Sequence, residues 1–137
     1  MGEVQGVMLH HTATPASAKG DYPSLRVVTR GHGTLKGLLC NFGLGRSGTI
    51  YLVTEGRAFH AGKGHYKGIT SGNSSLLGIE GEHPGTKTPW PEQQFDPYCR
   101  LVASVLHAPS AGTPPGTSGT ASGRWRGDGR STRRDMR

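Results

Sequence analysis

The stretch Gly6–Thr14, GVMLHHTAT, places an apolar run directly before two histidines and a group of small and hydroxyl residues. The run Val4–His10 is predicted to form a β-strand. Side chains alternate along a strand, so His10 and His11 are expected to point to opposite faces and not to bind one metal as a pair. One of them can present its imidazole at the strand's end, as a metal ligand does. The alternative is a strand that ends in solvated polar residues.

Composition and charge restrict the classes of protein that the chain can belong to. Its 137 residues suggest one domain, and its formal charge of +7 suits a polyanionic partner such as nucleic acid, an anionic membrane surface or the bacterial wall. Two cysteines are too few for a disulfide framework, and we expect both to be reduced. The N-terminus has no basic and apolar signal-peptide pattern, and no run approaches the ~20 apolar residues of a membrane helix.

The last thirty residues differ in composition from the rest. Residues 108–137 contain six Arg and two Asp, are rich in Gly, Pro, Ser and Thr, and have Trp125 and Met136 as their only large apolar side chains. Such a segment cannot offset the entropy of ordering itself, so we predict a disordered basic tail over 108–137 and a folded domain over 1–107.

The folded part is predicted to be α/β, with a mixed central β-sheet flanked by helices. Ser24 is expected to cap a short helix, and Pro97 is expected to kink a longer helix that follows Pro91 or to delay its start. The predicted elements after the first strand are a helix over Leu25–Arg30, strands over Leu38–Leu44, Thr49–Thr54 and Leu76–Glu82, and the helix of WPEQQFDPYCRLVASVLH.

Glu80 stands inside an apolar strand, in LLGIEGEH. A carboxylate there is costly unless it is paired or functional. Alternation places Glu80 and Glu82 on one face. If that face lines a cleft near a metal, Glu80 can act as general base on a bound water. A buried salt bridge, for instance to Arg46 or Arg57, is the alternative.

Four motifs in order carry a resemblance to a known family: GVMLHHTAT, LCNFGLGRSGTIYLVTEGRAFHAGKG, GNSSLLGIEGEHPG and WPEQQFDPYCRLVASVL. Together they resemble the zinc-dependent N-acetylmuramoyl-L-alanine amidases of the peptidoglycan-recognition-protein superfamily, most closely the amidase domains of actinobacteriophage endolysins. The resemblance covers about residues 4–107. It implies hydrolysis of the amide between N-acetylmuramic acid and L-alanine in peptidoglycan.

The resemblance also implies roles for individual residues. His10 corresponds to a ligand of the zinc cofactor, and Glu80 to the carboxylate that positions or deprotonates the attacking water. His60 and Asn73 correspond to residues that line the peptidoglycan groove. Some relatives have a tyrosine near the site where this chain has Cys40, which cannot supply a phenol.

The chain departs from the family after Leu106. A catalytic zinc usually has three protein ligands, and the family's second and third ligands lie in a segment resembling GH-x-E…PGRKxDP that is missing here. No histidine follows His107. Codons permitted for Gly127–Arg133 read Gly-Arg-Lys-Val-Asp-Pro in a shifted frame, so we hypothesise that a frameshift replaced this segment; the actual codons test the idea. A genuine flexible basic tail is the alternative.

These observations leave three interpretations. The first is an amidase of the phage-lysin type, which causes cell-wall lysis, acts as a monomer and stays in the host cytoplasm until it is released to the wall. The second is a peptidoglycan-binding module with an incomplete zinc site. The third, nucleic-acid binding by the Arg-rich tail, is the least favoured; no specific nucleic acid and no membrane is expected as a partner.

Overall fold

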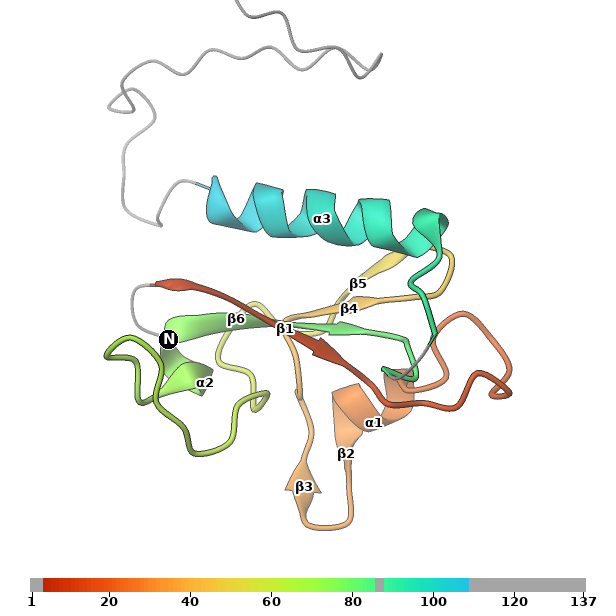
Figure 1. Ribbon diagram of the computed structural model, residues 1–137. Coiled ribbons are helices and arrows are strands. Elements are labelled where there is room, and N and C mark those ends of the chain that lie inside the picture. The colour runs from red at the N-terminus through yellow and green to blue at the C-terminus, as the bar shows by residue number, and fades with distance from the viewer. Residues whose placement is uncertain (1–3, 86–87, 109–137) are drawn as a thin grey trace, which may run out of the picture.

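The computed structural model describes residues 4–85 and 88–108 (Figure 1). The predicted tail lies outside these residues from position 109 onward. The described chain forms a single sheet with helices on both sides, together with a small hairpin. The expected α/β class, a mixed central sheet flanked by helices, is therefore confirmed. None of the helices in the described ranges is long and apolar enough to cross a membrane.

The central sheet has the strand order β1-β6-β4-β5. Strand β6 (Leu76–Gly81) pairs in parallel with β1 (Gly6–His11) and with β4 (Phe42–Leu44), and β5 (Ile50–Leu52) pairs antiparallel with β4. In this register His10 and Gly43 are the neighbours of Glu80 on either side. The carboxylate therefore lies near the middle of the sheet, beside a histidine on one strand and a glycine on the other.

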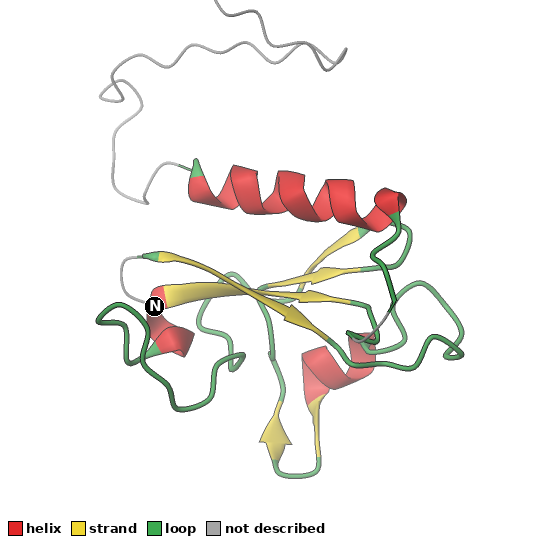
Figure 2. Cartoon of the chain, in the orientation of Figure 1, coloured by secondary structure: helices red, strands yellow, loops and turns green. Residues whose placement is uncertain are grey.

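Different elements cover the two faces of the sheet (Figures 1 and 2). Helix α3 (Glu92–Leu106) lies across one face. On the other side are the short helices α1 (Leu25–Arg30) and α2 (Gly72–Ser75) and the hairpin of β2 (Gly31–His32) and β3 (Leu35–Lys36).

Each face has its own apolar cluster. Leu44 and Ile79 pack with Tyr98 and Leu101 of α3. Both Leu44 and Ile79 are fully buried, which stabilises the fold by about 1.5–3 kcal/mol per side chain. The second cluster comprises Tyr22, Val28, Leu39 and Cys40.

Helix α3 begins at Glu92, directly after Pro91, so Pro97 does not delay its start. Proline has no N–H for the carbonyl four residues earlier, which here belongs to Gln93. Gly48, in the β4–β5 turn with φ 88°, lies against that carbonyl, where a Cβ atom would overlap it. The glycine therefore lets the turn pack closely on the part of the helix that the proline alters.

Three local predictions need correction. Ser24 precedes α1, but its side chain makes no capping bond, because the hydroxyl contacts Thr14 and Glu82 instead. The two middle strands are shorter than predicted, and Leu38 has φ 60°, outside the range of a strand. The hairpin β2–β3 and helix α2 were not predicted, since neither has an apolar periodicity.

Candidate functional site

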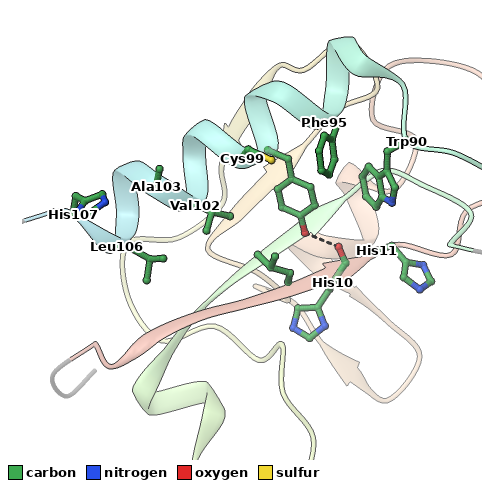
Figure 3. Close-up of a pocket in the computed structure, with 11 residues that line it drawn as sticks. His10, His11, Trp90, Phe95, Cys99, Val102, Ala103, Leu106 and His107 are labelled. Atoms are coloured by element: carbon green, nitrogen blue, oxygen red, sulfur yellow. Dashed lines mark hydrogen bonds between the residues drawn. The ribbon is translucent and has the colours of Figure 1, made fainter. Parts of the chain in front are cut away.

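The candidate site lies on the face of the sheet opposite α3, where β1 and β6 run side by side. His10 and Glu80 are paired in the register of these strands. The His10 Nε2 atom is 3.2 Å from Nδ1 of His60, which approaches from the loop after β5. Three of the four residues assigned from the sequence are thus brought together. Figure 3 shows the His10 ring directed away from α3.

Glycines make room for the side chains of this face. A Cβ atom at Gly78 of β6 would overlap the His60 ring, and a Cβ atom at Gly43 of β4 would overlap the Tyr22 ring. Glycine inside a strand often marks such a close approach. The bare backbone at these two positions allows an imidazole to lie on β6, two residues before Glu80, and a phenol to lie on β4, beside Glu80.

The Glu80 carboxyl has an unusual environment. Its Oε2 atom is buried, and no hydrogen-bond partner for it exists within the described chain. Burial, together with the nearby charge of Glu82, raises the pKa of Glu80 to about 7. The predicted alternative of a salt bridge is wrong, because Arg46 donates to the carbonyls of Ala18 and Pro15 and Arg57 lies over the Phe59 ring.

Glu82 lies two residues further along and has the opposite character. It is 1% exposed, and its carboxylate accepts bonds from Thr12 Oγ1 (3.1 Å), from the backbone N–H of Ser24 (3.1 Å) and from the hydroxyl of Ser24 (3.3 Å). These contacts attach the loop that follows β1 to the end of β6. Of the two carboxylates, Glu82 is satisfied by structural bonds, and Glu80 retains an oxygen without a partner.

The surroundings of the two site histidines favour their neutral form. Burial lowers the pKa of His10, and the neighbouring His60 and His11 lower it further. Burial also lowers the pKa of His60, against the opposing effect of its hydrogen bond to the Leu76 carbonyl. Neutral imidazoles are the form that binds metals. His11 takes no part in this pair, because its ring packs against the backbone of Gly85.

Asn73, predicted to line the groove, makes a definite structural contact. Its Oδ1 atom accepts a hydrogen bond of 2.6 Å from the backbone N–H of Ala61. Asn73 belongs to α2, directly before β6, and Ala61 directly follows His60. This bond therefore anchors the backbone that carries His60, and whether Asn73 also contacts a ligand stays a prediction.

The residues do not complete a three-ligand zinc site. Over 4–85 and 88–108, no three His, Cys, Asp or Glu side chains are grouped so that they could hold a metal ion. Among the described residues, His10 and His60 are the imidazoles that face each other at this site. The described part of the chain thus offers fewer protein ligands than the three that a catalytic zinc usually has.

Cys40 adds no reactive group to the site. It is fully buried, and burial together with the nearby Glu80 charge raises the pKa of its thiol to about 12. A phenol does reach this region from Tyr22, whose hydroxyl donates to the Glu80 backbone carbonyl at 3.1 Å. Tyr22 is itself buried, so it supports β6.

A second hollow lies on the opposite side of β1. It is a mainly apolar groove of about 640 Å³ between β1 and α3 (Figure 3). It lacks the unpartnered carboxylate of the first site, so we do not place the chemistry there. Its principal apolar lining residues are Leu9, Phe95, Val102 and Leu106.

The sequence matches the family model described as N-acetylmuramoyl-L-alanine amidase (Amidase_2) over residues 1–119. The chain belongs to this amidase family. A comparison with curated proteins finds no match. Family membership implies an amidase that acts on peptidoglycan, and the Amidase_2 family is generally zinc-dependent. The match extends past residue 107, and the predicted domain boundary there stays a prediction.

Sequence reasoning missed the residues that support this candidate site. Glu82 was placed on the face of Glu80 but was given no role, and Tyr22 was not considered. The bonds of Glu82 join residues far apart in the chain, which no local pattern reveals. The sequence did contain a signal for the close approach of side chains to the sheet. Gly43 and Gly78 interrupt apolar strands, where glycine is otherwise unfavourable.

Proposed function

We propose that the chain hydrolyses the amide between the lactyl group of N-acetylmuramic acid and L-alanine in bacterial peptidoglycan, with Glu80 as the general base. The observation that carries this proposal is the buried, unpartnered oxygen of Glu80 beside His10. A polar atom in such a place is costly unless it serves a ligand or a reaction. Membership of the amidase family supports the same substrate class.

The pKa of Glu80 fits this role. A general base is most efficient when its pKa is near the working pH. With a pKa of about 7, the carboxyl is about half ionised at neutral pH, and its ionised form is a stronger base than an ordinary carboxylate. Glu80 would remove a proton from the attacking water and return it to the departing amine of L-alanine. We place His60 and Asn73 at the substrate groove and His10 at a metal.

A second candidate function is peptidoglycan binding without cleavage. The specific observation in its favour is the lack of any three-ligand metal group in the part of the chain that the structure covers. The Glu80 face would then still accept a muramoyl peptide. The two candidates differ in one outcome, which is whether the bound peptide is recovered intact.

The test uses N-acetylmuramoyl-L-alanyl-D-isoglutamine with the full chain, its Glu80→Gln variant and, as a matched control, Glu55→Gln at an exposed position. Binding is measured by calorimetry and cleavage by mass spectrometry. If the chain is a hydrolase with Glu80 as its base, the wild type and Glu55→Gln release the dipeptide. Glu80→Gln then binds the muramoyl peptide without cleaving it. Binding with no release by any of the three supports the binding module. If none of them binds or cleaves the peptide, both candidates are wrong.

We also propose that the chain acts as a phage lysin on the cell wall, as a monomer that stays in the host cytoplasm until it is released. The support is the ordered motif series from His10 to the strand of Glu80. The test adds the protein to a suspension of actinobacterial cell walls and follows the turbidity. We expect the turbidity to fall with untreated walls and to stay constant with walls treated beforehand with an amidase.

A further inference from the structure

The groove between β1 and α3 exposes apolar side chains to solvent (Figure 3). Leu9 of β1 and Phe95 and Leu106 of α3 line it, and they are 54%, 52% and 57% exposed respectively. In the sheet of the described residues β1 is an edge strand, so no further strand covers Leu9 from that side. Monomeric proteins rarely leave a contiguous apolar patch open unless it is an interaction site. An apolar occupant is therefore expected in this groove.

The two ends of the groove differ in what lies beyond them. Figure 3 shows Phe95 at one end and Leu106 and His107 at the other. At the first end the Trp90 ring forms a wall of the groove. Phe95 and Leu106 are 11 residues apart in α3, which corresponds to about 16 Å along the helix. At the second end the chain continues past Ala108, the last described residue, directly after His107.

The chain beyond Ala108 carries a side chain suited to such a groove. Residues 109–137 contain two large apolar side chains, Trp125 and Met136, and the tryptophan can bury the larger area. Trp125 lies 17 residues beyond Ala108. A Gly- and Ser-rich connection of that length has an expected end-to-end distance of about 20–25 Å, which is enough to span the groove. Because the connection is covalent, the local concentration of Trp125 at the groove is on the order of 1 mM.

The charges beside Trp125 complement those beside the groove. Arg124 and Arg126 flank the tryptophan in the sequence. Glu92 and Asp96 lie in the first two turns of α3, at the end of the groove remote from the exit of the chain, and both are exposed. Unlike charges around an apolar contact fix the orientation of the partner. This end of the groove therefore favours a basic segment over an acidic one.

We propose that the stretch Arg124–Arg126 docks into the groove of its own chain. The Trp125 indole lies between Leu9 and Phe95, and the two arginines point toward the acidic first turns of α3. The proposal covers this short stretch of 109–137 and no more. The docked stretch covers the apolar side chains on the face of the sheet opposite Glu80, and it leaves the Glu80 face open to a ligand. The inference therefore does not depend on whether the chain cleaves peptidoglycan.

The experiment uses fluorine NMR of the full chain labelled with fluorotryptophan. The protein gives two signals, from Trp90 and Trp125, and Trp125→Phe assigns them. The position of the Trp125 signal in concentrated urea is the reference for an undocked ring. Phe95→Ala and Leu106→Ala remove apolar contacts of the groove, and Leu35→Ala removes a similarly exposed leucine of the β2–β3 hairpin as the matched control. Circular dichroism melting curves check that each variant is folded.

We expect the native wild-type Trp125 signal to lie well away from the urea reference at every protein concentration, since the docking is intramolecular. Phe95→Ala and Leu106→Ala should each move the signal at least halfway to the reference. Leu35→Ala, and Met136→Ala in the same C-terminal segment, should leave it in place. The inference is wrong if the native signal coincides with the reference, or if both groove variants are folded and leave it unmoved. A signal that depends on protein concentration would place a second copy in the groove and would also overturn the inference.

Discussion

Replacement of Glu80 by glutamine should make the protein more stable at alkaline pH and change its stability little in acid. On folding, the pKa of this carboxyl rises from an ordinary 4.5 to about 7. Between these values the native state binds more protons than the unfolded state, so stability falls as pH rises through this window. The contribution is fully present below about pH 4.5 and is lost above about pH 7. Glutamine does not ionise and escapes this loss.

The expected size follows from the same shift. A rise from 4.5 to about 7 corresponds to about 3 kcal/mol of lost stability for a fully buried group. Glu80 is only partly buried, so solvent screens the charge, and we take about 1–2 kcal/mol. The gain in unfolding free energy from Glu80→Gln should therefore be about 1–2 kcal/mol larger at pH 8 than at pH 4.

Urea unfolding followed by circular dichroism, with a chelator present, measures this difference. Every other titrating group is common to both proteins, so its contribution cancels. Glu55→Gln, at an exposed position, should show no such pH dependence. A difference between Glu80→Gln and the wild type that is independent of pH, or larger at pH 4, would refute the burial argument on which the role of Glu80 rests.

Two further substitutions test the supports of the site. Glu82→Ala should lower the unfolding free energy by about 2–4 kcal/mol, because it leaves the Ser24 and Thr12 donors without their buried acceptor; urea unfolding checks this, and a loss below about 1 kcal/mol would contradict it. Gly78→Ala should lower the unfolding free energy by about 1–3 kcal/mol, because the added Cβ atom would overlap the His60 ring, while Gly62→Ala, where a Cβ atom meets nothing within 4 Å, should change it little. Urea unfolding of both variants measures this difference, and equal stabilities would show that the His60 ring does not rest on Gly78.

The fold was largely predictable because its main elements carry strong local signals. The apolar runs that end at His10 and that contain Glu80 lie in β1 and β6, and the short helix Leu25–Arg30 was predicted with its observed ends. The ends of the shorter strands were less predictable. Leu38, for example, adopts a positive φ that nothing in its side chain requires. Helix α3 continues through Pro97, and Gly48 of the β4–β5 turn packs on that part of the helix, a tertiary contact that no local pattern reveals.

The candidate site was predictable in part. Alternation along a strand placed Glu80 and Glu82 on one face, and the motif resemblance selected His10 and His60 separately. The contact between these histidines depends on how the loop after β5 folds back over Gly78, which is a matter of tertiary packing. The different roles of the two carboxylates depend on bonds from Thr12 and Ser24, which the sequence separates widely from Glu82.

The measurement that tests the central claim most directly is an NMR titration of the full chain with N-acetylmuramoyl-L-alanyl-D-isoglutamine. Shifts in the side-chain signals of His10, His60 and Glu80, with little change at Phe95 and Leu106 of α3, are the predicted result. Shifts confined to Phe95, Leu106 and the other side chains of the α3 groove would contradict it and would place the peptide on the opposite face of the sheet.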